Sequence, residues 1–194
     1  MSQPMLFAMS NDDRRVPQEP IVREASVSGD YRFWLRRAWG SGPTLGWIML
    51  NPSTADETRD DPTLWRIMGF SLRWGYGALV VVNVYPFRSP SIEELHRWRS
   101  KQNDAVTTMF TGNASLAAHE LRRCDDVVAA WGDGADRIDT LFFLKMLDDE
   151  HRRLTGKRAR MLSLGTTAAG SPKHPLARGK SRVPDDFKPV IWRS

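Results

Sequence analysis

Apolar residues in this chain cluster into short continuous runs, each followed by a polar residue or a turn. Four such runs cover residues 47–50, 80–82, 127–131 and 161–164. Strands that are buried on both faces of a parallel sheet have continuous apolar sequences, whereas half-exposed strands alternate. The runs therefore predict four buried strands whose polar ends meet at one edge of a sheet, which is where open α/β sheets bind ligands.

A first helix is predicted after the strand that ends near residue 50. Asp61 is suited to an N-cap, and Pro62 is suited to the first helical position. Residues then recur at helical spacing at Leu64, Ile67, Met68, Ser71 and Leu72. Glycines at 75 and 77 end this helix before the next strand, over 78–84, so the segment predicts a right-handed crossover between parallel strands.

Three more helical segments are predicted further along the chain. The capping-box spacing of Ser91 and Glu94 predicts a short helix over 92–99, and a helical region is expected within 104–123 with an interruption at 112–113. A third helix is predicted from the helical stripe formed by Ile138, Leu141, Phe142, Lys145 and Met146. Strands that alternate with helices predict a three-layer α/β/α sandwich around a central, mostly parallel four-stranded sheet.

The remaining segments complete the predicted domain. Residues 1–20 are polar and contain prolines, which predicts a flexible N-terminal arm ahead of a single α/β domain over 21–194. Aromatic and basic residues alternate over 31–37, as in an exposed or edge strand, and the segment after residue 164 is predicted to be rich in loops. Cys124 is the only cysteine, which excludes an internal disulfide and any zinc or iron–sulfur site built on several thiolates of one chain.

The charge and hydropathy of the chain indicate which binding partners and which cellular location to expect. No apolar run approaches the roughly 20 residues that span a bilayer, and the first residues lack the pattern of a signal peptide. We therefore expect a cytosolic protein with no membrane partner. The net charge is +5, and residues 151–182 contain nine Lys and Arg but no Asp or Glu. This stretch favours a polyanionic partner such as DNA, although a solvated basic surface has the same composition.

The polar loop at 51–56 carries the most distinctive candidate chemistry. Pro52 restricts Asn51 to an extended conformation, so the Asn51 amide projects from the strand end, where it can orient a water or a ligand. The alternative is that Asn51 and Ser53 only close the loop through an Asx or serine turn. Both interpretations remain open from the sequence.

Two acidic residues near this loop have no assigned partner in the sequence. Because Asp61 serves as the helix cap, Asp56 and Asp60 are the candidates for a free carboxylate that binds a metal or activates water. The histidines lack metal-ligand spacing, and the chain has no phosphate-binding Gly-Lys-Ser loop. We therefore predict no resident metal and no cofactor.

Asn83 follows the second apolar run, and two aromatic residues come shortly after it. An amide offers one acceptor and two donors, which complement the edge of a nucleobase, while Tyr85 or Phe87 can stack on its face. A buried asparagine that only joins neighbouring loops would have the same sequence pattern.

His174 lies in a proline-containing basic loop after the fourth run. Neighbouring cations disfavour protonation, so we expect a neutral imidazole that donates a hydrogen bond. Nucleic-acid contacts are predicted around it, at Lys173, Leu176, Arg178, Lys180 and Arg182.

From about residue 31 to residue 182, the chain resembles a bacterial and phage domain family of unknown function. The matching motifs are Asn-Pro-Ser-Thr-Ala-Asp at 51–56, Asp-Asp-Pro-Thr at 60–63 and His-Pro-Leu at 174–176. The order of the strand-end motifs is also similar, more distantly, to the uracil-DNA glycosylase superfamily. In this chain the late His-Pro loop is shorter than in that superfamily, and Ser53 stands where its asparagine branch has glycine.

The glycosylase resemblance implies a role for each strand-end residue. Asn51 matches the residue that activates water, Asn83 the residue that recognises the base, and His174 the histidine that stabilises charge on the departing base. Leu176 and Arg178 lie near the wedge that enters DNA. Pro52, Ser53, Tyr85 and Phe87 complete the predicted substrate site.

The leading hypothesis is therefore a DNA-glycosylase-like hydrolase or base-recognition protein that acts on an uncommon or modified base in nucleic acid. The alternatives are a non-catalytic nucleic-acid or nucleotide-binding module of the same fold, and a metal-dependent enzyme that uses Asp56 and Asp60 on free nucleotides.

Overall fold

Four parallel strands form the centre of the sheet, in the order β4, β3, β5 and β6, and they coincide with the four apolar runs. The computed structural model describes residues 20–102, 105–124 and 126–193. The central strands are β3 (Thr44–Met49), β4 (Ala78–Asn83), β5 (Asp126–Ala129) and β6 (Met161–Ser163). Nearly all of their residues are buried, because helices cover both faces of the sheet. The predicted α/β class is confirmed.

Three antiparallel strands extend this centre, so the prediction of a four-stranded sheet is wrong. The seven-stranded mixed sheet has the order β1-β2-β4-β3-β5-β6-β7. The added strands are β1 (Val22–Ser28), β2 (Tyr31–Ala38) and β7 (Val190–Arg193). The prediction of an exposed or edge strand over 31–37 is also wrong, since β2 pairs with both β1 and β4. Its arginines suggested exposure, but Arg37 is buried through partners that the local sequence does not show.

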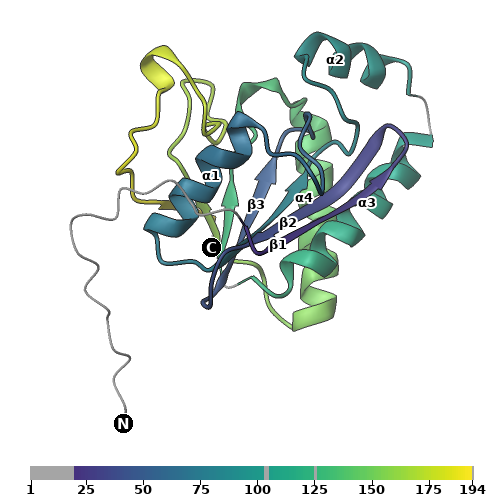
Figure 1. Cartoon of the computed structure of the whole chain (residues 1–194). Helices are drawn as coiled ribbons and strands as arrows, with labels where there is room; N and C mark the ends of the chain where they lie inside the picture. Colours follow the sequence, from purple (N-terminus) through teal and green to yellow (C-terminus); the bar gives the residue numbers. More distant parts are fainter. Residues whose placement is uncertain (1–19, 103–104, 125, 194) are drawn as a thin grey trace.

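Helices lie on both faces of the sheet (Figure 1). Helix α1 (Pro62–Arg73) covers one face, where its Ile67 and Phe70 join Trp47 in a core. Helices α3 (Ala105–Leu121) and α4 (Arg137–Thr155) cover the other face, where they form a second hydrophobic core with the sheet. Leu95 of α2 (Ile92–Ser100) packs in this second core. Two short 3₁₀ turns lie at Gly132–Gly134 (η1) and Gly179–Ser181 (η2).

Two details of the predicted helices are wrong. Helix α3 runs without interruption through 112–113, because the buried Asn113 side chain donates from Nδ2 to the carbonyl oxygens of Asn83 and Val84, at 2.9 and 3.2 Å. In α4, Ile138 and Leu141 of the predicted stripe are 77% and 51% exposed. Phe142 and Met146 of the stripe pack against the core, but the buried residues of α4 are Asp139, Thr140, Phe143, Leu144, Leu147 and His151.

The chain ends were predicted to be an arm and a loop-rich segment. The predicted arm lies outside the described residues except for Pro20. Residues 165–189 form loops that pack on α1, where Arg66 of the helix and its C-cap residue Trp74 donate to the carbonyl oxygens of Val183 and Phe187. None of the helices in the described part of the chain has the length and apolar character needed to cross a membrane.

Candidate functional site

A cavity of about 270 Å³ opens at the carboxyl edge of the parallel strands. The ends of β3 and β4, the start of the antiparallel β2, the first turn of α1 and the loop after β6 all contribute to it. Its volume is close to the lower end of the range for small-molecule sites, about 300 Å³. Its charged and amide-bearing or imidazole side chains are Arg32, Asn51, Asp61, Asn83 and His174.

Asn83 is the last residue of β4, and its side chain lacks the partners that a buried amide normally has. It is 1% exposed, and neither its Nδ2 nor its Oδ1 has a hydrogen-bond partner among the described residues. Its main chain, by contrast, is held firmly by Asn113. A buried amide without partners costs about 1–3 kcal/mol. The fold thus holds an unpaired donor and acceptor at the cavity.

His174 reaches the same cavity from the loop after β6. Its Nδ1 accepts a hydrogen bond from the Leu176 amide at 3.1 Å, so in the neutral ring the proton is on Nε2. Burial lowers the pKa of His174 below its ordinary 6.5, and the carboxylate of Asp61 opposes this shift only in part. His174 is therefore neutral at pH 7 and able to donate from Nε2.

Gly132 positions the loop that carries His174. Its amide donates to the carbonyl of Pro172 at 2.9 Å, and its φ is +71°. A Cβ on Gly132 would lie 3.3 Å from Cβ of His174, which is closer than ordinary van der Waals contact. Glycine allows both the backbone conformation and the close approach.

Asn51 lies at the cavity, but most of its amide serves the loop structure. Its Nδ2 lies 3.0, 3.3 and 2.9 Å from the carbonyl oxygens of Pro52, Phe87 and Ser89. The amide nitrogen therefore ties the two loops after β3 and β4 together. Oδ1 is the atom of Asn51 that is left to accept a hydrogen bond from a water or a ligand. Ser53 also lines the cavity, whereas Pro52 is buried beside it.

The structure adds two residues that the sequence did not indicate as ligand-binding. Arg32 is 4% exposed, its Nη1 donates to the carbonyl of Ala55 at 2.6 Å, and its Nε has no partner among the described residues. Asp61 caps α1 as predicted, by accepting from the amide of Leu64 at 2.8 Å, but its carboxylate also lines the cavity. Burial lowers the pKa of Arg32 to about 10, so it remains a cation at neutral pH.

A register shift places Arg32 on the cavity side of the sheet. Ser26 pairs with Trp34, but the next residue, Val27, pairs with Arg32, so the register skips Phe33. Simple alternation would put Arg32 on the face opposite Arg37. The extra residue reverses the alternation, and such bulges commonly redirect a side chain beside a functional site.

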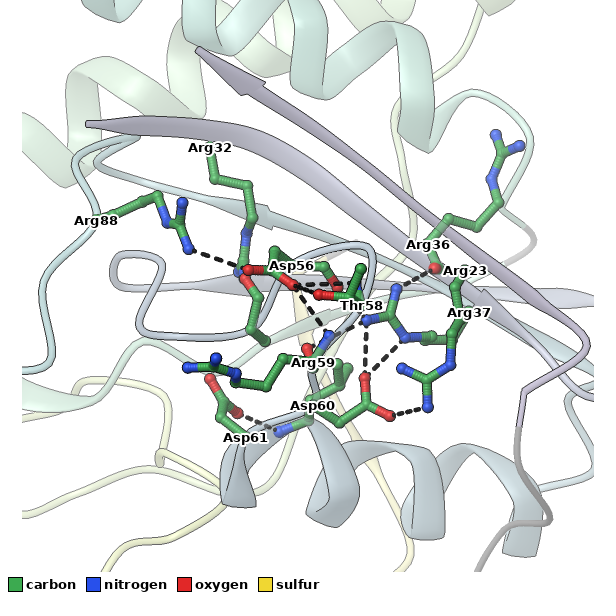
Figure 2. Close-up of polar contacts among 12 residues, drawn as sticks. Arg23, Arg32, Arg36, Arg37, Asp56, Thr58, Arg59, Asp60, Asp61 and Arg88 are labelled. Carbon is green, nitrogen blue, oxygen red and sulfur yellow. Dashed lines mark hydrogen bonds and ion pairs between the residues drawn. The ribbon is translucent and has the colours of Figure 1, made fainter. Parts of the chain in front are cut away.

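Asp56 and Asp60 are not free carboxylates, so that prediction is wrong (Figure 2). Asp60 accepts from Nε and Nη2 of Arg37 at 2.9 and 2.7 Å, and from Nη2 of Arg23 at 2.8 Å. Oδ1 of Asp56 accepts from the amides of Thr58 and Arg59 in an Asx turn. Burial of Asp56 opposes ionisation, but these hydrogen bonds outweigh it and lower the pKa. Among the described residues, no cluster of His, Cys, Asp and Glu could hold a metal ion.

The two predicted stacking residues lie outside the cavity. The hydroxyl of Tyr85 donates to Asp139 at 2.8 Å and accepts from the amide of Asp136 at 3.1 Å, on the α4 side of the sheet. Phe87 stacks on Trp98, with ring centroids 4.9 Å apart. The cavity walls that would face a planar ring are aliphatic instead, formed by Leu35, Met49, Leu64, Ile67, Val81 and Ile92.

The predicted nucleic-acid contacts lie beside the cavity without lining it. They follow or flank His174 in one loop, and Leu176 is 40% exposed. Arg178, Lys180 and Arg182 are exposed, while Lys173 is half-buried.

The fold and the site define an α/β protein with a cavity at the carboxyl edge of its parallel strands, lined by aliphatic and polar side chains. Residues 32–176 match the family described as "Protein of unknown function (DUF1643)", so the chain belongs to this family. The three motifs that gave the family resemblance lie within the matched segment. No curated protein and no solved structure matches the chain.

Proposed function

We propose that this protein binds a single nucleobase of a nucleic acid in the cavity and acts as a DNA-glycosylase-like hydrolase on an uncommon or modified base. The observation that carries the proposal is the unpartnered, buried carboxamide of Asn83 among the cavity residues. Such a group destabilises the fold unless a water or a ligand completes its hydrogen bonds, and at the cavity a ligand can do so. A base edge offers the adjacent donor and acceptor that one carboxamide needs.

The surroundings of Asn83 suit an extruded base. Aliphatic side chains provide apolar walls for the ring faces, and the cavity volume favours a small planar group over a whole nucleotide. The exposed cations at 178, 180 and 182 are available for the phosphates on either side. Extrusion of one base into a pocket is the usual way in which enzymes reach a base inside a nucleic acid.

Hydrolysis of the N-glycosidic bond needs a positioned water and a donor to the leaving base. In the proposal, Oδ1 of Asn51 accepts from the water, whose oxygen bonds to C1′ of the sugar while the bond electrons leave with the base. Nε2 of His174 donates to the oxygen or nitrogen on which negative charge develops. The proton lost by the water passes to the base or to solvent. One donor of this kind typically contributes about 3 kcal/mol.

The test uses oligonucleotides that contain uracil, mismatched bases or modified pyrimidines, with release of the base as the readout. We expect an abasic product from at least one substrate, and loss of that product in Asn51→Ala and His174→Asn. The His174→Asn variant keeps an acceptor for the Leu176 amide but lacks the Nε2 donor. His119→Asn, at an exposed position of α3, is the matched control and should keep full activity. No abasic product from any substrate would overturn the hydrolase proposal.

The hydrogen bonds of Asn51 support a second function, the binding of a base without cleavage. The amide nitrogen of Asn51 is engaged by loop carbonyls, and the nearby carboxylates of Asp56 and Asp60 are held by other groups. Since neither Asp56 nor Asp60 is free to activate a water, the site is compatible with a module that recognises a base and does not cleave it. Base-dependent binding that survives Asn51→Ala, with no turnover, would select this alternative.

A further inference from the structure

Besides Asn83, the cavity contains two buried residues of opposite charge that do not pair with each other. Arg32 and Asp61 are 4% and 8% exposed. Among the described ion pairs, none joins them. Arg32 uses one hydrogen bond to a backbone carbonyl, and Asp61 accepts one from the first turn of α1. Each therefore keeps hydrogen-bonding capacity at the cavity.

These two residues impose a fixed requirement on a ligand. A guanidinium can only donate, so the ligand atom beside Arg32 must be an acceptor. An ionised carboxylate can only accept, so the ligand atom beside Asp61 must carry a hydrogen. Asn83 differs, because rotation of its carboxamide exchanges donor and acceptor. Discrimination between bases is therefore expected from Arg32 and Asp61 more than from Asn83.

Arg32 and Asp61 together favour one class of base. Among the charged, amide and imidazole groups, the donors are Nε of Arg32, Nδ2 of Asn83 and Nε2 of His174, and the acceptors are Oδ1 of Asn51, Oδ1 of Asn83 and the Asp61 carboxylate. An oxo group of the base can accept a hydrogen bond from Arg32. An amino group at the same ring position is a donor, so it would face the Arg32 donor without forming a hydrogen bond. A ring N–H next to the oxo group is the donor that Asp61 requires.

We propose that Arg32 and Asp61 form a second recognition element of the cavity, and that the base bound there carries an oxo group next to a ring N–H, as uracil and hypoxanthine do. This inference rests on the proposed function, since it presupposes that the ligand is a base. It assigns specificity to a residue of β2 that reaches the cavity only through the register shift at Phe33.

The test uses single-stranded oligonucleotides in which one base is flanked by stable abasic spacers. The base is uracil, cytosine, hypoxanthine or adenine, so each pair exchanges an oxo for an amino group on one ring, and all four share the same backbone. Fluorescence anisotropy at fixed salt gives the Kd values. We expect uracil and hypoxanthine to bind about tenfold more tightly than cytosine and adenine, the discrimination given by one well-formed polar contact.

Replacing two arginines of β2 in turn shows which of them causes the preference for oxo bases. Arg32→Met should reduce it to about twofold or less, and Arg32→Lys, which keeps a cationic donor, should retain part of it. Arg36→Met is the matched control, because Arg36 pairs with Glu24 and Glu120 away from the cavity. Thermal unfolding of each variant shows whether it is folded. A full preference in folded Arg32→Met would overturn the role of Arg32.

Two outcomes separate this inference from the function on which it rests. If the protein binds oxo and amino bases with equal affinity, and this affinity falls in Asn83→Leu, then the inference is overturned but base binding is not. Affinity that depends neither on the base nor on Asn83 would overturn base binding, and the inference with it.

Discussion

Two arginines on strand β2 are both buried, but they differ in how completely their hydrogen bonds are satisfied. Arg37 is 0% exposed, and its guanidinium contacts the Asp60 carboxylate and the carbonyl oxygens of Arg36, Asp56 and Arg59. Arg32 has one carbonyl partner and an unpartnered Nε. Figure 2 shows both side chains beside the loop that precedes α1.

This difference distinguishes a structural use of buried charge from a ligand-binding use. A buried charge with complete partners contributes to a unique fold, and removing one partner is costly. A buried polar group with missing partners costs stability in the free protein, and such groups are expected where a ligand supplies the partner. On this basis the Arg37–Asp60 pair holds the loop, and we propose that Arg32 and Asn83 receive their missing hydrogen-bond partners from a ligand.

The largest predicted effect follows from breaking the complete pair. Asp60→Ala leaves the Arg37 charge buried without its carboxylate, and we expect the free energy of unfolding to fall by about 3–5 kcal/mol. Urea denaturation measures this. Asp185→Ala is the control, because its carboxylate is exposed and pairs with Arg66 at the surface, where a pair contributes about 0–1 kcal/mol. Equal losses in the two variants would contradict the structural role of the cluster.

A smaller change is expected when the incompletely partnered arginine is replaced. Arg32→Met removes a buried charge together with its unsatisfied Nε, and we expect unfolding free energy to change by less than about 2 kcal/mol. The same urea titration applies. If Arg32→Met destabilises the fold as much as Asp60→Ala, then Arg32 is structural and the comparison fails.

Gly132→Ala tests how the His174 loop is held. The positive φ costs about 1–2 kcal/mol for a residue with a Cβ, and the added carbon presses on His174. Gly156→Ala is matched, since its φ of +76° carries the same strain with open space around it. We expect similar losses of stability in both, and reduced oligonucleotide binding only in Gly132→Ala. Normal binding by Gly132→Ala would show that this contact does not position His174.

The smallest predicted effect is a pH dependence from His174. Because burial lowers its pKa in the folded state, the unfolded chain binds this proton first as pH falls. The contribution to stability is thus full above about pH 6.5 and declines between 6.5 and the lowered folded pKa. The difference in unfolding free energy between wild type and His174→Asn, measured from pH 5 to 8, should show this decline. A difference that is independent of pH would contradict it.

The sequence predicted the parts of the fold that depend on local patterns. The four central strands, the Asp61 cap and the Ser91 cap of α2 are confirmed, because apolar runs and capping residues act over a few positions. The predicted Asn51, Asn83 and His174 all line one cavity, since the carboxyl ends of parallel strands converge.

What the sequence could not supply depends on distant partners. The stripe on α4 predicts only part of its buried face, because Asp139 faces inward to accept from Tyr85 and Arg99, so a charged residue takes a core position. Arg32 was missed because the register shift that directs it to the cavity has no local signature. The sequence predicts a free carboxylate at Asp56 or Asp60 because their partners, Arg23 and Arg37 among them, come from another part of the chain or from the backbone.

We infer that the buried, unpartnered amide of Asn83 lowers the stability of the free protein and serves to bind a ligand. Asn83→Leu tests it most directly, with unfolding free energy and affinity for single-base oligonucleotides measured on the same sample. We expect the unfolding free energy to stay unchanged or to increase by up to about 2 kcal/mol, and the affinity to lose its dependence on the base. A clear loss of stability with unchanged base-dependent binding would show instead that Asn83 is a structural residue.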